Sequence, residues 1–149
     1  SCADFSREEV CRVANSQDEY NKALQNLLTM SGKKAEIKKV WENASPTSAY
    51  PKQEIPHDID SACDAVSIIC RLSTTNPIEH VSTFRRGQTG ELSVTGWYSD
   101  RLTTAQRNVA YGTNKRYTVS GGVYFNDLVN TSSSDVCIPL AMYEIKWKE

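Results

Sequence analysis

The pattern of apolar residues changes near residue 78, and this change constrains the fold more than any other feature of the sequence. From there on, the segments IEHVSTFRR and ELSVTGWYS alternate apolar with polar residues, which is typical of strands with one buried face. GQTG, at 87–90, lies between them and is typical of a glycine-containing hairpin loop. RYTVSGGVYF and VCIPLAMYEIKW repeat the alternation, so residues 76–149 predict an antiparallel sheet of about four strands.

A glycine pair, Gly121-Gly122, interrupts one of these predicted strands. Glycine inside a strand weakens the pairing and often marks a bulge or a sharp bend. We therefore expect a curved sheet, which can close around the elements that cover it.

The first 75 residues predict mainly helices. SREE at 6–9 and SQDE at 16–19 both match the capping box, in which a serine and a glutamate three positions later satisfy backbone N–H groups at a helix start. The second of these helices ends near Ser31-Gly32. A third is predicted over 33–43, and its inward positions are Ile37, Val40 and Trp41.

Residues 44–60 contain three prolines and cannot continue a helix. Beyond them, Asp60 is a suitable helix cap, yet the β-branched residues of 60–72 also suit a strand. We favour a helix for 60–72 and keep a strand as the alternative. Helices followed by strands indicate one α+β domain over 1–149, with a helical layer (1–75) packed on a curved antiparallel sheet (76–149).

Five cysteines bear on the compartment: Cys2, Cys11, Cys63, Cys70 and Cys137. Their spacing matches neither a zinc site nor a thiol enzyme, so disulfides and an oxidising compartment are predicted, with reduced buried thiols as the alternative. With Cys2 set aside, the other four form two disulfides in any of three pairings. If 60–72 is helical, Cys63 and Cys70 lie two turns apart and do not bond to each other. Cys137 would then tie the final strand to the helical layer.

Charge and hydropathy restrict the partners. Seventeen basic and eighteen acidic side chains are interspersed, which argues against a nucleic-acid binder with its basic stripe. No apolar stretch approaches the roughly 20 residues that span a bilayer, so a lipid on Cys2 is the candidate membrane anchor. The predicted location is the periplasm, the outer membrane through that anchor, or the exterior.

Catalytic motifs are missing from the sequence. It contains no phosphate-binding or dinucleotide glycine motif, no zinc-protease motif and no nucleophile elbow, and we predict neither a metal nor a cofactor. The weak candidates for catalysis are His57, beside two aspartates, together with His80, Arg85 and Glu91. We expect neither histidine to be indispensable: His57 decorates or caps the proline-rich loop, and His80 lies on a strand face.

Aromatic residues of the strand region are the candidate binding residues. Tyrosine and tryptophan combine a large contact area with a polar tip, which suits a pocket or an interface. We predict a binding role for Trp97, Tyr98 and Tyr124. The alternative is that strand aromatics fill the core of a curved sheet.

Three segments, DEYNKA, LTTAQRNVAYGTNKRYTVSGGVYF and CIPLAMYEIKWKE, carry a resemblance to a known family. They are similar to the first helix and the later strands of the periplasmic domain of the inner-membrane assembly component of type IV secretion systems. That family belongs to the nuclear-transport-factor-2-like superfamily, so the resemblance implies a cone-shaped α+β roll and partners in the secretion machinery. The sequence departs from the family in having several cysteines and no preceding membrane helix.

These observations lead to one leading hypothesis for the function and to two alternatives. The leading hypothesis is an exported, disulfide-stabilised, non-enzymatic binding or assembly module that docks to another protein of a bacterial envelope or secretion system, with homo-oligomers left open. The alternatives are a small secreted enzyme or toxin with its site in the mouth of the curved sheet, and a small-ligand carrier that uses the same mouth. A pocket of several hundred Å³ lined by aromatics favours the alternatives, and a filled mouth with an exposed apolar patch favours docking.

Overall fold

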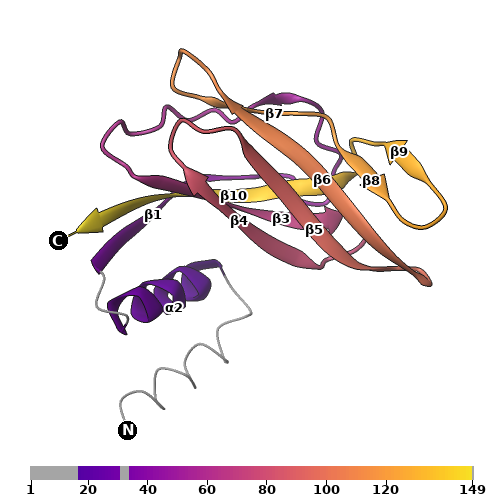
Figure 1. Cartoon of the computed structure of the whole chain (residues 1–149), viewed down its shortest axis with the longest axis horizontal. Coiled ribbons are helices and arrows are strands. Elements are labelled where there is room, and N and C mark those ends of the chain that lie inside the picture. The colour runs from indigo at the N-terminus through magenta and orange to yellow at the C-terminus, as the bar shows by residue number, and fades with distance from the viewer. Residues whose placement is uncertain (1–16, 31–33, 149) are drawn as a thin grey trace, which may run out of the picture. The chain divides into compact units, whose positions relative to one another are not determined.

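The computed structural model describes residues 17–30 and 34–148 (Figure 1). The chain divides into two compact units, which are described separately: Ser1–Lys38 with Ile145–Glu149, and Lys39–Glu144. No helix among the described residues is long and apolar enough to cross a membrane.

Strands dominate the structure, so the predicted α+β class with an N-terminal helical layer is wrong. The described residues form one helix and ten strands: α2 (Gln17–Met30), β1 (Lys34–Glu42), β2 (Gln53–Glu54), β3 (Ala65–Ser73), β4 (Glu79–Arg85), β5 (Gly90–Tyr98), β6 (Arg101–Tyr111), β7 (Tyr117–Val119), β8 (Val123–Phe125), β9 (Asn130–Ser132) and β10 (Val136–Lys148). Three of the strands, β1 to β3, lie in the half of the chain for which helices were predicted. The helix predicted to start at 6–9 lies outside the described residues.

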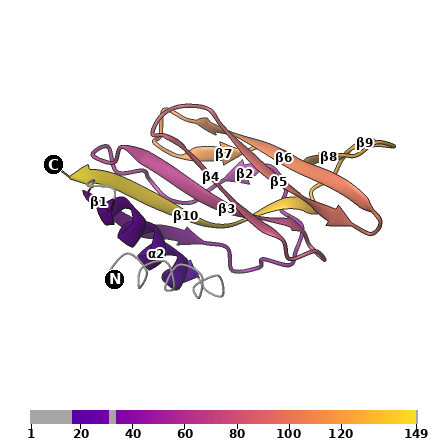
Figure 2. The ribbon, with the colours of Figure 1, turned by 60° about the horizontal axis from the view of Figure 1, so that its bottom comes forward.

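Two sheets make up the strand region. One has the order β1-β10-β3-β4, and the other has the order β2-β7-β6-β8-β9, with β5 paired to the remaining edge of β6. Figures 1 and 2 show β5 and β6 lying over β3 and β4, which they contact. Fully buried side chains from both sheets, Ile68, Leu72, Leu92, Val94 and Val109, form the core between them.

The chain passes from one sheet to the other between β4 and β5. β4 pairs with β3, and β5 pairs with β6, so 87–90 is not the loop of a paired hairpin as predicted. A Cβ atom on Gly90 would lie 2.6 Å from the ring of Phe84, so glycine permits the close approach of the two sheets here. The tight hairpin is instead Ser99-Asp100, between Tyr98 and Arg101, where Ser99 has φ 61°.

Two segments predicted as helices are strands. Residues 33–43 contain β1, in which Ala35 and Ile37 are buried and Glu36 and Lys38 exposed, a period of two that competes with the helical spacing. Residues 60–72 contain most of β3, which is buried almost throughout. In both cases a neighbouring strand, β10, supplies the backbone partners that decide between helix and strand.

The glycine pair produces the predicted bulge. Val119 of β7 lies opposite Val109, and Val123 of β8 lies opposite Gln106, so residues 120–122 face only residues 107–108. One extra residue on the β7–β8 side divides that predicted strand into two short ones, both paired to β6.

The helix α2 contacts β1 within the smaller unit. Asn21 Nδ2 donates to the carbonyl of Ile37 at 3.4 Å, and Gln25 Nε2 donates to the carbonyl of Ala35 at 2.9 Å. Four helical residues rise about 6 Å and two strand residues about 6.6 Å, so amides one turn apart match carbonyls two residues apart. β1 is the edge strand of its sheet, and these two amides tie the helix to it.

Candidate functional site

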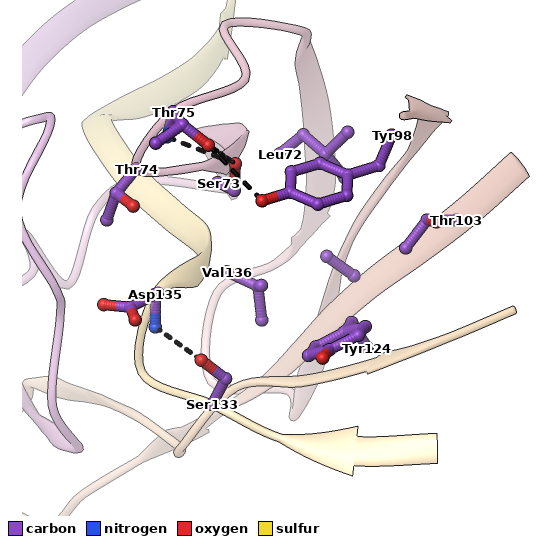
Figure 3. A pocket seen from close by; sticks show the side chains of 11 residues that line it. Leu72, Ser73, Thr74, Thr75, Tyr98, Thr103, Tyr124, Ser133, Asp135 and Val136 are labelled. Atoms are coloured by element: carbon purple, nitrogen blue, oxygen red, sulfur yellow. Dashed lines mark hydrogen bonds between the residues drawn. The ribbon is translucent and has the colours of Figure 1, made fainter. Parts of the chain in front are cut away.

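A hollow of about 350 Å³ lies between the two sheets at the end of β3 (Figure 3). Residues 72–75 form one wall, and β5, β6 and β8 contribute Tyr98, Thr103, Ala105 and Tyr124. Ser133, Asp135 and Val136 close the remaining side. The hollow belongs entirely to the unit Lys39–Glu144.

Small side chains on the inner face of β6 leave this space open. Thr103 and Ala105 point inward and are buried. Because β3 ends at Ser73, this strand does not extend over them. Tyr124 is the register partner of Ala105, and its side chain therefore stands beside it on the same face. A strand of larger residues at these positions would fill the hollow.

Two tyrosines lie on opposite sides of the hollow. Figure 3 shows Tyr98 beside Leu72 on one side and Tyr124 across the space from it. The hydroxyl of Tyr98 points toward Thr75, and their oxygens are 3.5 Å apart. Together the two rings offer apolar surface at the edges of a polar space.

Hydroxyl groups line the wall between the tyrosines. Ser73 Oγ accepts from the backbone N–H of Asn76 at 2.9 Å and of Thr75 at 3.3 Å, and Ser133 Oγ accepts from the N–H of Asp135 at 3.1 Å. Ser73 Oγ also lies 3.4 Å from Thr75 Oγ1, which in turn lies 3.5 Å from the Tyr98 hydroxyl, so these three hydroxyls form one hydrogen-bonded chain. Ser133 Oγ keeps a proton to donate. Among the described lining residues Asp135 is the one carboxylate, and no lysine, arginine or histidine is present. The wall therefore suits an uncharged ligand better than an anion.

An exposed apolar patch lies on the outer face of the same sheet. Trp97 is 64% exposed and lies directly opposite Leu102, which is 55% exposed. Phe125 is the register partner of Thr104, which places it diagonal to Leu102. Leu128 and Val129, in the turn that follows, are also exposed. We call these five residues the outer patch.

The structure brings together two of the three predicted binding residues. Tyr98 and Tyr124 line the hollow, whereas Trp97 lies on the opposite face of β5 in the outer patch. Sequence analysis missed the hydroxyl wall, which includes Ser73, Thr75 and Thr103. A run of three hydroxyl residues directly after an apolar strand, at 73–75, was the available signal.

His57 does more than decorate its loop. Its Nε2 atom lies 2.8 Å from Oε2 of Glu144, whose side chain is only 5% exposed, and the same oxygen accepts from the N–H of Asp60 at 2.9 Å. Neighbouring Cys63 has its pKa raised to about 11, chiefly by burial and then by the charge of Glu144. A catalytic cysteine needs a lowered thiol pKa, so Cys63 does not fit that role.

The other weak catalytic candidates are dispersed. His80 is exposed on β4, and its Nδ1 accepts from the N–H of Thr95 at 3.3 Å. Arg85 is exposed at the far end of β4, and Glu91 accepts from Gln106 Nε2 at 3.0 Å on the outer face of β5. None of the three lines the hollow. The structure thus assembles no catalytic group from them.

The described cysteines form neither a disulfide nor part of a metal-ligand cluster in this structure. Cys63, Cys70 and Cys137 are buried free thiols, so no disulfide links them in this structure. Cys2, the lipid-anchor candidate, and Cys11 lie outside the part of the chain that the structure describes. Histidine, cysteine and acidic side chains form no cluster suited to a metal ion across the described ranges.

Comparison with known proteins adds no relative to this picture. No protein-family model matches the sequence, and comparison with curated proteins and with solved structures gives no match either. The resemblance to the type IV secretion component therefore stays a prediction, and the function has to be argued from the site itself.

Proposed function

We propose that this chain is an exported, non-enzymatic binding module that holds a small uncharged ligand in the hollow between Tyr98 and Tyr124. The observation that carries the proposal is a hollow of about 350 Å³ with a tyrosine on either side and hydroxyl groups between them. Small-ligand sites commonly measure about 300–1,000 Å³ and combine aromatic surface with a few placed polar groups.

The lining selects the chemistry of the ligand. The faces of the tyrosines favour a ligand with an apolar face, and the hydroxyls of Ser73, Thr75 and Ser133 favour one with hydrogen-bonding groups at its rim. Asp135 can accept from hydroxyl groups and disfavours an anion. A monosaccharide or a related polyol meets these conditions.

A binding role is better supported than catalysis at this site. An activated serine or threonine needs a general base within hydrogen-bonding reach, and no histidine or lysine is among the described residues that line the hollow. Ser73 and Ser133 instead accept hydrogen bonds from backbone N–H groups of their own loops. Export rests on the cysteine spacing in the sequence, which fits neither a zinc site nor a thiol enzyme, while the three described cysteines are buried free thiols.

Titration with a panel of monosaccharides and polyols tests this function, with saturation-transfer NMR and calorimetry as the readouts. We expect Tyr98→Ala and Tyr124→Ala each to weaken binding at least about tenfold, because each removes one face of the site. Trp97→Ser is the matched control, since it removes an adjacent aromatic that faces away from the hollow. The proposal is wrong if no compound binds the folded protein, or if the Trp97 variant loses as much affinity as the tyrosine variants.

A second candidate function is docking to another protein of the envelope or secretion machinery. The outer patch favours it, because contiguous exposed apolar residues mark interaction sites on soluble proteins. Cross-linking in the native envelope, with the partner identified by mass spectrometry, tests this alternative. Docking predicts that Trp97→Ser with Leu102→Ser abolishes the cross-link while Tyr98→Ala with Tyr124→Ala preserves it, and the opposite pattern rejects it.

A further inference from the structure

Three hydroxyl groups at the edge of the hollow lie in a row. Ser73 Oγ is 3.4 Å from Thr75 Oγ1, which is 3.5 Å from the hydroxyl oxygen of Tyr98 (Figure 3). Ser73 is 4% exposed, whereas Thr75 and Tyr98 are exposed, and all three line the hollow. The row therefore leads from a buried hydroxyl to one that a ligand can reach.

The Ser73 end of the row has no acceptor capacity left. A hydroxyl carries one proton and two lone pairs. Ser73 Oγ accepts from the N–H groups of Asn76 at 2.9 Å and of Thr75 at 3.3 Å, so both of its lone pairs are occupied. In its contact with Thr75 Oγ1, Ser73 is therefore the donor. The backbone of residues 73–76 thus fixes the direction of the first hydrogen bond in the row.

The turn that carries Thr75 is held against β5. Nδ2 of Asn76 donates to the carbonyl of Trp97 at 3.0 Å, and Oδ1 of Asn76 accepts from the N–H of Ile78 at 3.1 Å. Tyr98 follows Trp97 directly, so the same bonds keep Thr75 beside the hydroxyl of Tyr98. A group that is oriented before binding loses little freedom when a ligand arrives.

The protons of two other hydroxyls at the hollow have different fates. Thr103 Oγ1 donates to the carbonyl of Arg101 at 3.4 Å, so it has no proton left for a ligand. Ser133 Oγ accepts from the N–H of Asp135 and keeps its proton. On the wall that β5 and β6 contribute, Tyr98 is therefore the hydroxyl with a proton to offer.

We propose that Ser73 donates to Thr75, Thr75 donates to Tyr98, and Tyr98 donates to the ligand. The second step follows the first because a hydroxyl that accepts a hydrogen bond becomes a stronger donor. The inference rests on the proposed function and narrows its ligand to one that places an acceptor oxygen against Tyr98. A cyclic sugar meets this condition through its ring oxygen, which accepts and cannot donate. Tyr98 is the specificity-determining residue, and Thr75 is a positioning residue.

Two small rings of similar size test the direction of the chain by NMR titration of the whole protein. Tetrahydrofuran has an oxygen that accepts and no proton to donate, whereas pyrrole has an N–H that donates and no comparable acceptor. We expect Tyr98→Phe, which keeps the aromatic ring, to weaken tetrahydrofuran binding about threefold to tenfold, because one hydrogen bond to the ligand is lost. Pyrrole binding should change by less than about twofold.

Tyr111→Phe is the matched control, because it removes the hydroxyl of a tyrosine that is not among the lining residues. It should leave the binding of both rings unchanged. If Tyr98→Phe weakens pyrrole instead of tetrahydrofuran, Tyr98 accepts from the ligand and the proposed direction is wrong. Tetrahydrofuran binding that is absent, or that is unaffected by Tyr98→Phe, overturns the proposal as well.

Two variants of Thr75 test its positioning role. Thr75→Val removes the middle hydroxyl, and Thr75→Ser keeps it. We expect the preference for tetrahydrofuran over pyrrole to fall about threefold in the valine variant and to be retained in the serine variant. The preference is a ratio of two dissociation constants of the same folded protein, so a general loss of stability does not move it. Equal preferences in the two variants would remove Thr75 from the chain.

Failure of this inference is distinguishable from failure of the proposed function. A sugar whose binding is lost in Tyr98→Ala supports the ligand site whatever the two rings show. If that sugar binds and Tyr98→Phe leaves tetrahydrofuran unaffected, the site stands and the direction of the hydroxyl chain is wrong. If neither the sugars and polyols nor tetrahydrofuran bind the folded protein, both proposals are wrong.

Discussion

The interior around Arg107 and the hollow between Tyr98 and Tyr124 both place polar groups between the two sheets, and they differ in where those groups find partners. Arg107 is closed off from solvent and donates to three backbone carbonyls of its own chain. The hydroxyls of Ser73 and Ser133 accept from nearby backbone N–H groups and border an open space, and Ser73 also contacts the Thr75 hydroxyl at 3.4 Å. Buried polar groups that are satisfied internally, such as Arg107, hold the fold together, whereas polar groups that border an open space are available to a ligand.

The largest loss of stability is expected from Arg107→Met, which removes the hydrogen bonds of the buried guanidinium. It removes the guanidinium donor from the carbonyls of Val136 and Ser120, whereas the carbonyl of Ser134 keeps the N–H of Tyr50 at 2.8 Å. Each buried group left unpaired costs about 1–3 kcal/mol, so we expect a loss of at least about 2 kcal/mol of unfolding free energy. Urea denaturation measures this. Arg116→Met is the control, because Arg116 pairs with Asp58 at 2.7 Å on the surface, and its removal should change stability far less. Equal losses in the two variants would contradict the structural role of Arg107.

A second test of internally hydrogen-bonded polar groups uses the contact between His57 and Glu144. His57→Leu removes one hydrogen-bond partner of the buried Glu144 carboxylate and keeps the N–H of Asp60, at an expected cost of about 1–3 kcal/mol of unfolding free energy. His57→Gln retains a donor and should cost less. The double variant His57→Leu with Glu144→Leu closes a thermodynamic cycle. Additive losses would show that the contact contributes no coupling.

Enlarging a side chain should affect stability differently in the packed core and in the hollow. Ala141 is fully buried and does not line the hollow, so Ala141→Leu should destabilise the protein by about 1–3 kcal/mol through overpacking. Ala105 lines the hollow, so Ala105→Leu should cost less and should block the ligand. Thermal unfolding and the ligand titration report the two effects. An Ala105 variant that binds normally would show that the hollow is not the site.

The smallest effect is expected at Tyr50, whose buried hydroxyl has no hydrogen-bond partner among the described residues. Tyr50→Phe should leave stability near neutral pH unchanged or slightly increased. Burial raises the pKa of Tyr50 to about 12, so the unfolded chain releases the phenol proton first, near pH 10. Wild-type stability should then fall as pH rises from about 10 to 12, by on the order of 1 kcal/mol at pH 11. Unfolding free energies at pH 8 and 11 test whether the variant loses less.

Part of this architecture was predictable from local patterns. The alternation in 78–86 and 91–99 identified β4 and β5, and the capping box at 16–19 identified α2. The glycine pair identified the bulge between β7 and β8. Local patterns suffice in these cases because each feature depends on a few neighbouring residues.

β6 shows why alternation alone did not find every strand. Its inward residues are Thr103, Ala105, Arg107 and Val109, so burial alternates regularly along the strand while hydrophobicity does not. Arg107 can be buried because carbonyls from 120, 134 and 136 receive its protons, and those residues are distant in the sequence. A polar strand of this kind is recognisable only when its partners are known.

The residues of the candidate site likewise fall into those that the sequence indicated and those that only the structure revealed. The sequence by itself indicated Tyr98 and Tyr124 as binding residues, because an aromatic ring with a polar tip has that capacity in many settings. Only the tertiary structure decided that these two face one hollow while Trp97 faces outward, and that 73–75 supplies its hydroxyl wall. Likewise the sequence alone indicated β4, β5 and α2, and sheet pairing decided that β1 and β3 are strands. The physical reason is that strand pairs and interior contacts join residues far apart along the chain, and their energies appear only when both partners are present.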